Sequence, residues 1–307
     1  MLSKTITPAN SPFVYQHKSF QMKKLVTTIV SLIFIISLNA QTRPSVSEPA
    51  GMVFVPQGSF QMEITRNSET KVTNVSVDAF WMSNEISNAE FREFVDWVKK
   101  NPNETLYQVK YSMEVITDSK KGITKDTLIR KINPIEVSKL TSEIIDPLCL
   151  DKANKSFKDY FYDIKYNDYP VVGVSFTMAE YFCLWKTKMV NDQMKEKGMP
   201  NVHSYRIPLE TEWEYVAQQP NLKGDKNSPA STIQKVNEGT SNDWGLFHLN
   251  NNVSEWVTPV MKEKSGIIRG GSWKSENSIS ARQVIDPNSK EANVGFRIVQ
   301  SYITETK

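Results

Sequence analysis

The sequence predicts a mixed, irregular α+β domain in which a few capped helices are scattered among short strands. Three Ser/Thr-x-x-Glu boxes, at Ser87, Thr177 and Thr211, each precede apolar residues and so mark the start of a helix. Segments with a period-two apolar pattern, bounded by turn residues, predict strands between them. With 307 residues, of which 39% are hydrophobic, the chain can bury a sizeable core.

The N-terminal region predicts export. Residues 1–21 are polar and unpatterned, whereas Met22 and two lysines open an apolar run of 14 residues, 25–38, that ends before Ala40. This run is too short for a comfortable membrane span, so we predict a signal peptide at 22–40, cleaved after Ala40, with an uncleaved anchor as the alternative. Residues 1–21 then precede the true start, and 41–307 form the mature domain. No cysteine lies near the cut, so we expect no lipoprotein.

Loss of residues 1–40 removes four lysines and no acidic residue, which leaves 33 basic against 34 acidic side chains. A nearly neutral chain has no electrostatic reason to bind nucleic acid or an anionic membrane broadly. Cys149 and Cys183 are the only cysteines, and an oxidising compartment leaves a disulfide between them open. The apolar neighbours of Cys183 favour a small helix residue packed in a core.

Apolar periodicity and a capping box predict the first strands and the first helix of the domain. Residues 51–60 and 72–77 alternate apolar and polar side chains, which predicts the two strands of a hairpin. The box at Ser87 and Glu90 then opens a helix that ends near Asn101 and Pro102. The apolar face of this helix is formed by Phe91, Phe94, Val95 and Val98.

The middle of the chain differs in character. Residues 103–169 are charged and carry only short β-prone pieces, so they are interpreted as an insertion. Residues 168–175 predict a short buried strand before the helix that begins at Thr177. A further helix follows Thr211, and residues 221–242, rich in Asn, Ser, Gly and Lys, predict a surface loop.

The C-terminal region carries the most specific pattern. Arg-Gly-Gly-Ser-Trp at 269–273 and Val-Gly-Phe-Arg at 294–297 close a series of ordered motifs at 52–60, 85–91, 169–185, 205–215 and 245–256. This order resembles the formylglycine-generating enzyme family, also called the sulfatase-modifying factor family, over nearly all of the mature chain. The resemblance implies one compact domain with little regular secondary structure, distantly similar to C-type lectin folds.

In that family two cysteines five residues apart follow the Gly-Gly-Ser-aromatic turn, and here both positions are serine, Ser275 and Ser280. Thiolates bind copper and attack sulfur, whereas serine hydroxyls do neither at neutral pH, so we expect no copper and a pseudoenzyme. A serine hydrolase is disfavoured, because no histidine lies in this loop and neither serine sits in a nucleophile elbow.

The resemblance also maps Asn252 and Glu255 onto ligands of a calcium ion, and oxygen donors of this kind suit Ca²⁺. The alternative is that both side chains close the loop by hydrogen bonds without metal. Arg206 and Arg269 are expected to pair with carboxylates rather than bind substrate. The tryptophans of these motifs are expected in the core rather than along a groove.

Within the family the chain looks most similar to the GldK/GldJ-type gliding-motility and type IX secretion proteins, through residues 167–174, 182–187, 267–274 and 296–302. This implies an exported, non-catalytic structural or interaction subunit, in the periplasm or at the periplasmic face of the outer membrane. Its expected partners are secretion or motility components of the cell envelope, and the oligomeric state is open. The alternatives are a formylglycine-generating oxidase, disfavoured by the two serines, and a calcium-dependent module for glycan or cell-wall ligands.

Overall fold

The computed structural model describes residues 48–66, 69–118, 123–140, 157–202, 204–219, 232–259, 265–275 and 281–302. For 64–66, 69, 111–118 and 123–130 only the backbone is described. The predicted extension and signal peptide, residues 1–40, lie outside these ranges, as do Cys149 and Ser280. In the described part of the chain, no helix is both long and apolar enough to cross a membrane.

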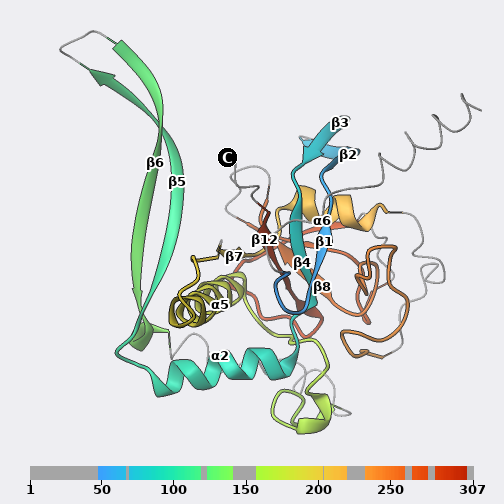
Figure 1. Ribbon diagram of the computed structural model, residues 1–307. Helices are drawn as coiled ribbons and strands as arrows, with labels where there is room; N and C mark the ends of the chain where they lie inside the picture. The colour runs from blue at the N-terminus through green and yellow to red at the C-terminus, as the bar shows by residue number, and fades with distance from the viewer. Residues whose placement is uncertain are drawn as a thin grey trace, which may run out of the picture. The chain divides into compact units, whose positions relative to one another are not determined.

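The elements are few helices and many short strands (Figure 1), which confirms the predicted mixed α+β class. The strands are β1 (Met52–Val55), β2 (Gly58–Arg66), β3 (Glu69–Val77), β4 (Phe80–Glu85), β5 (Thr105–Asp118), β6 (Ile123–Glu136), β7 (Tyr205–Arg206), β8 (Ser254–Val257), β9 (Gly266–Arg269), β10 (Arg282–Ile285), β11 (Val294–Gly295) and β12 (Arg297–Ser301). The helices are α2 (Asn88–Lys100), α5 (Phe176–Glu196) and α6 (Glu210–Ala217), with short 3-10 turns η1 (Val137–Lys139) and η3 (Ile164–Tyr166).

Two four-stranded sheets bring distant parts of the chain together. One has the order β1-β4-β12-β7, with all neighbours antiparallel. The last strand of the chain, β12, therefore lies between β4 from the N-terminal part and β7 from the middle of the chain. The other has the order β10-β9-β8-β11, in which β11 pairs with β8 in parallel. Because β11 and β12 are separated only by Phe296, the chain passes directly from one sheet to the other at the predicted Gly-Phe-Arg motif.

The predicted N-terminal hairpin is partly wrong. Its second half is correct, since β2 pairs with β3 from Gly58↔Val77 onward. Its first half forms a separate strand, β1, which pairs with β4. The break falls at Pro56, which has no backbone N–H to donate and so interrupts a ladder.

The helix starts were predicted with mixed success. The box at Ser87 is confirmed, because the Glu90 N–H bonds to the Ser87 hydroxyl and the Glu90 carboxylate accepts from the Ser87 N–H. The box at Thr177 is wrong: Ser175 is the cap, and its hydroxyl accepts from Met178 N. The box at Thr211 is also displaced, because α6 begins at Glu210 after Leu209.

Two loop predictions need correction. Residues 168–175 are buried from Pro170 onward, but they form no strand, because Pro170 lacks an N–H and Gly173 has a φ of 72°. Their N–H groups instead bond to separate partners, Val171 to Ile86 O and Gly173 to Glu291 O. Of the predicted surface loop at 221–242, the described part is not wholly exposed, since Ile233, Val236 and Asn242 are buried, whereas 220–231 lie outside the described residues.

The predicted insertion contains more structure than the sequence indicated. β5 and β6 form one antiparallel hairpin of 14 residues per strand, paired from Thr105↔Glu136 to Asp118↔Ile123 (Figure 1). Its base is anchored, because Leu106 and Val137 are buried in the core cluster that contains α2 and α5. The pattern of short β-prone pieces underestimated these strands, since cross-strand pairing supports the polar residues between them.

The largest core cluster lies where α2 and α5 meet the sheets. Phe91 of α2 stacks on Phe182 of α5 with ring centroids 5.7 Å apart, and Phe296 meets Phe182 edge-on at 5.4 Å. Cys183 belongs to this cluster as a free, buried thiol, which confirms its expected role as a small core residue. The packing fixes Phe296, and therefore the strands that flank it, against the helices.

Candidate functional site

The loop after β9 holds the position of the first missing cysteine. Gly270 has a φ of 81°, and an added Cβ would lie 3.0 Å from Leu249 O and from Trp213 Cζ2, so only glycine suits this turn. Trp273 N then donates to Asn252 O at 2.8 Å. This hydrogen bond connects the turn to the loop that carries Asn252 and Glu255.

Ser275 faces a second hydroxyl at this turn. Its Oγ lies 3.0 Å from Ser272 Oγ, which also accepts from Asn293 Nδ2 at 3.1 Å. His203 lies outside the described residues, and His248 is bonded to Glu85. The Ser275 hydroxyl therefore lies beside another neutral hydroxyl, and Ser280 lies outside the described residues.

A buried ion pair lies behind the turn. Arg297 binds both carboxylate oxygens of Glu255, with Nε to Oε2 and Nη2 to Oε1 each at 2.6 Å. Trp213 Nε1 donates to the same Oε2 at 2.7 Å, and all three side chains are almost completely buried. Burial opposes the charge of Arg297, but the attraction of Glu255 outweighs it and raises the pKa of the guanidinium.

A second buried group adjoins this pair. Glu85 Oε2 lies 3.2 Å from His248 Nδ1, and Glu85 Oε1 accepts from Asn252 Nδ2 at 2.9 Å. Asn252 has a φ of 63°, a conformation that asparagine tolerates better than most residues, and its Oδ1 accepts from Gln234 N at 2.8 Å. Burial opposes ionisation of both partners, but the mutual attraction prevails, so the pKa of His248 is raised and that of Glu85 is lowered.

The side chains predicted as calcium ligands do not fit the ion in this arrangement. Both oxygens of Glu255 accept hydrogen bonds from Arg297 and Trp213, and a guanidinium 2.6 Å away repels a second cation. The Asn252 oxygen accepts from the backbone of Gln234. These contacts match the alternative interpretation, in which both side chains close the loop by hydrogen bonds, and calcium binding remains an untested hypothesis.

Calcium is therefore expected to leave the melting temperature of the protein unchanged relative to a chelator. Differential scanning calorimetry in calcium chloride and in EDTA provides the measurement. A calcium-dependent rise that disappears in Asn252→Ala would contradict this expectation, because it would require the loop to release its hydrogen bonds and take the ion. Asn293→Ala, which removes an amide from the neighbouring turn, is the matched control.

The Glu85–His248 pair predicts a pH-dependent stability. The pKa of His248 in the folded protein is raised above 6.5. The contribution of His248 to the free energy of unfolding is therefore complete below pH 6.5 and is lost as the pH rises through the folded-state pKa. Because the folded pKa of Glu85 is lowered below 4.5, its stabilisation is lost as pH falls through that pKa. Urea unfolding measures the free energy of unfolding of wild type and of His248→Gln. The difference between the two should therefore shrink between roughly pH 6 and pH 9. A constant difference across that range would refute the assignment.

The expected pairing of the two arginines with carboxylates is confirmed, and the expected core position is confirmed for two of the three motif tryptophans, Trp213 and Trp256. Arg206 forms a two-point pair with Glu212, at 2.7 and 2.6 Å, and Arg269 donates to Glu214. Trp213 and Trp256 are fully buried, and Trp256 Nε1 donates to Val174 O at 2.8 Å. The third, Trp273, is only partly buried, and its ring is tilted by 52° to that of Phe157 with the centroids 6.2 Å apart.

The sequence reasoning missed Glu85, His248 and Arg297 as members of the buried network. The sequence carried a usable signal for Glu85 and Arg297. Glu85 ends an apolar strand and Arg297 follows a buried Phe, and a charged residue in such a place needs a partner inside the protein. The identity of those partners depends on contacts across 42 to 167 residues of sequence. No local pattern contains that information.

A comparison with protein-family models decides the relationship. The model for the sulfatase-modifying factor enzyme 1-like domain matches residues 38–229 and 218–302. The chain belongs to this family. Its Gly-Gly-Ser turn and Gly-Phe-Arg junction, which hold Ser275 and Arg297, both fall inside the matched regions of the sulfatase-modifying factor domain.

Known relatives agree with this membership. "Inactive C-alpha-formylglycine-generating enzyme 2" of Bos taurus is 24% identical over 299 residues, which cover 81% of this chain and 88% of the relative. Two solved structures are similar: PvdO from Pseudomonas aeruginosa, at 16% identity and a TM-score of 0.50, covers 86% of this chain and 100% of its own. Treponema denticola variable protein 1, at 15% identity and a TM-score of 0.47, covers 82% and 95%. At these identities the PvdO structure supports the sulfatase-modifying factor fold alone.

Proposed function

We propose that this protein is a non-catalytic member of the sulfatase-modifying factor family that acts by binding other proteins in the cell envelope, as a subunit of the gliding-motility and type IX secretion apparatus. The observation that carries the non-catalytic part is the hydroxyl pair of Ser275 and Ser272 at a position where the family's chemistry requires a thiol. The name of the bovine relative, an inactive enzyme, supports the same conclusion.

The described cysteine cannot substitute for the missing thiols. Cys183 is buried in α5 among core side chains, and burial raises the pKa of its thiol, which suppresses the reactive thiolate. A thiol in this position serves packing rather than copper binding. The remaining cysteine, Cys149, lies outside the described residues.

The β5–β6 hairpin is the proposed contact surface. On one face, Leu106 is buried in the core and Lys110 lies close enough to Glu180 of α5 to influence its pKa. The opposite face carries Tyr107 and Ile132, which are 62% and 50% exposed. A two-stranded ribbon gains little stability by itself, and exposed apolar side chains on such a ribbon favour a protein partner.

A capture experiment tests the proposal. We expect the tagged full-length protein to recover secretion or motility components from an envelope extract, identified by mass spectrometry, and a Tyr107→Ser/Ile132→Ser variant to recover them poorly. Met199→Ser, which removes an exposed apolar side chain from the loop after α5, is the matched control. If the wild-type protein recovers no secretion or motility component, the assignment to that apparatus is wrong. If the hairpin variant recovers these components as well as wild type does, the hairpin is not the contact surface.

The motif resemblance supports the assignment to gliding motility and type IX secretion. Residues 167–174 and 296–302, which carry part of that resemblance, each contribute to the core, with Val171 and Phe296 fully buried. The exported location, in the periplasm or at the outer membrane, follows from the predicted signal peptide. Detection of the tagged protein in the cytoplasmic fraction after cell fractionation would overturn it.

A further inference from the structure

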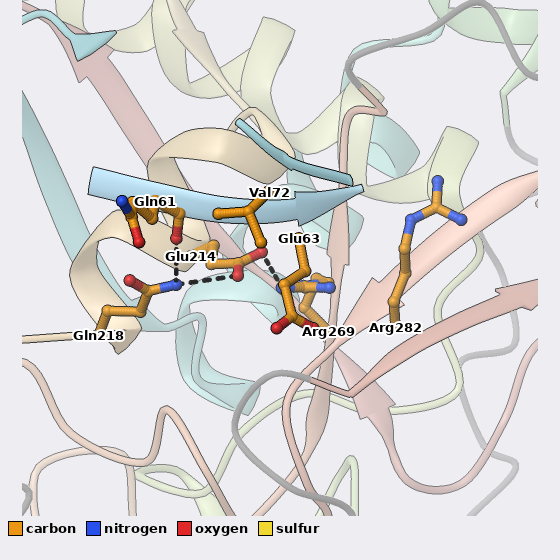
Figure 2. A pocket seen from close by; sticks show the side chains of 7 residues that line it. All are labelled: Gln61, Glu63, Val72, Glu214, Gln218, Arg269 and Arg282. Atoms are coloured by element: carbon orange, nitrogen blue, oxygen red, sulfur yellow. Dashed lines mark hydrogen bonds and ion pairs between the residues drawn. The ribbon is translucent and has the colours of Figure 1, made fainter. Parts of the chain in front are cut away.

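A polar cavity of about 690 Å³ lies between the β2–β3 hairpin, α6 and the β9–β10 pair (Figure 2). Its lining is almost wholly polar or charged and consists of Gln61, Glu63, Val72, Glu214, Gln218, Arg269 and Arg282. A volume of this size accommodates a side chain together with the main chain that carries it. Among the described residues, the Ser272–Ser275 turn contributes none to this lining, so the cavity is a separate candidate site.

The charged groups of the lining balance one another. The lining contains two carboxylates, those of Glu63 and Glu214. It also contains two guanidinium groups, those of Arg269 and Arg282. Both arginines pair with the buried Glu210, since Arg282 Nε donates to Glu210 Oε1 at 2.7 Å and Arg269 Nη1 lies 3.5 Å from that oxygen. A lining with matched charges offers no counter-charge to an ion, which favours an uncharged occupant.

The oxygens of Glu214 already have donors. Oε2 accepts from Arg269 Nη2, and Oε1 accepts from Gln218 Nε2 at 3.0 Å (Figure 2). Gln218 Nε2 also donates to the backbone oxygen of Gln61 at 3.2 Å, so this amide links α6 to β2. An occupant must therefore bond to other groups of the lining.

The lining contains one buried donor without an acceptor. Arg269 is 3% exposed, and its Nε forms no hydrogen bond with any residue that the structure describes. A buried donor in this state is unfavourable, so an acceptor that enters the cavity gains most at this atom. Nε is covered by its neighbours, and the exposed side chains of the lining, Gln61 and Glu63, can change rotamer to admit the acceptor.

Glu63 and Val72 define the rest of the site. They pair directly across the antiparallel strands, so both side chains leave the same face of the hairpin. Within the described part of the chain no ion pair holds the Glu63 carboxylate, which can therefore accept an N–H. Val72 is 59% exposed and offers apolar surface beside that carboxylate. A matching occupant has an acceptor for Arg269, a donor for Glu63 and an apolar stem for Val72.

We propose that this cavity binds the carboxamide side chain of a glutamine or asparagine from a protein partner. The carboxamide oxygen accepts from Arg269 Nε, its N–H donates to Glu63, and its methylene stem lies on Val72. A carboxamide carries an acceptor and two donors on one uncharged group. A carboxylate of the same shape is disfavoured, because it has no donor for Glu63 and is repelled by it. The inference rests on the proposed function, because it assigns a partner chemistry to a protein that acts by contact.

Titration of the full-length protein with blocked amino acids tests the cavity without any partner. The probe is N-acetyl-glutamine methylamide. The glutamate and norleucine analogues are the controls, because they share its main-chain amides and differ at the end of the side chain. In protein with isotope-labelled arginine, we expect the glutamine probe to shift the NMR signal of the Arg269 Nε–H group downfield and the controls to shift it little. The signal is assigned by its loss in Arg269→Lys, and that of Arg206, which lies outside the lining, should not move.

Glu63→Met, which removes the acceptor for the carboxamide N–H, should weaken binding of the glutamine probe by about fivefold, the scale of one hydrogen bond. Glu93→Met, the same change at an exposed position of α2, should leave binding unchanged. An Arg269 signal that responds to no probe, or as strongly to glutamate or norleucine as to glutamine, would overturn the proposal. Normal probe binding by a protein that captures no envelope component would count against the proposed function alone.

Discussion

Replacing Glu255 with alanine is expected to lower the free energy of unfolding by about 3–5 kcal/mol, the range for removal of one partner of a buried ion pair. The reason is that Arg297 is completely buried and would keep its charge without the two carboxylate oxygens that now hold it at 2.6 Å. Trp213 would lose its acceptor at the same time. Urea unfolding followed by circular dichroism measures the loss, provided that the variant folds.

A second variant keeps this prediction testable if Glu255→Ala does not fold. Glu255→Met with Arg297→Met removes both charges together, and it should recover a substantial part of the lost stability because no buried charge is left unpaired. Asp192→Ala, which breaks an exposed pair with Lys188, should cost less than about 1 kcal/mol. If Glu255→Ala were as mild as Asp192→Ala, the buried pair would contribute little to the fold.

The Ser275→Cys/Ser280→Cys variant is expected to bind Cu(I) firmly enough to retain it through gel filtration, whereas wild type should emerge without copper. Soft thiolates select Cu(I), and a serine hydroxyl stays protonated and binds it poorly. The backbone turn that positions Ser275 is already built, since Gly270 and the Trp273–Asn252 bond fix it. Metal analysis of the eluted protein makes the measurement.

Matched variants separate copper binding at this turn from binding elsewhere. Ser275→Ala/Ser280→Ala should behave as wild type, and so should a variant with the same two cysteines and Gly270→Val, in which the turn cannot form. Wild-type protein that retained copper and converted a thiol peptide to formylglycine would refute the non-catalytic assignment outright.

Local features were predictable from sequence, and long-range ones were not. The capping box at Ser87 was correct because both of its hydrogen bonds lie within four residues. The box at Thr177 failed because Ser175 ends the extended segment before α5 and takes the cap, although it lacks a glutamate three residues later. The class of fold followed from capped helices among short strands, and the family resemblance followed from motif order, which the family match then supported.

The candidate site was predicted in its chain positions but not in its connections. Asn252 and Glu255 were singled out together, yet each is bonded to a different partner from another strand, Glu85 of β4 and Arg297 of β12. Those strands are neighbours only because β12 enters the sheet beside β4. The charge balance within the core thus follows from topology, which the alternation of apolar residues along a single strand does not encode.

The placement of β12 inside the sheet has a consequence for how the chain matures. Since β12 joins β4 to β7, a ribosome that has not yet released the last residues leaves β4 without its inner neighbour and Glu255 without Arg297. Vectorial synthesis therefore cannot yield a finished domain, and a product truncated before Arg297 should be degraded rather than accumulate.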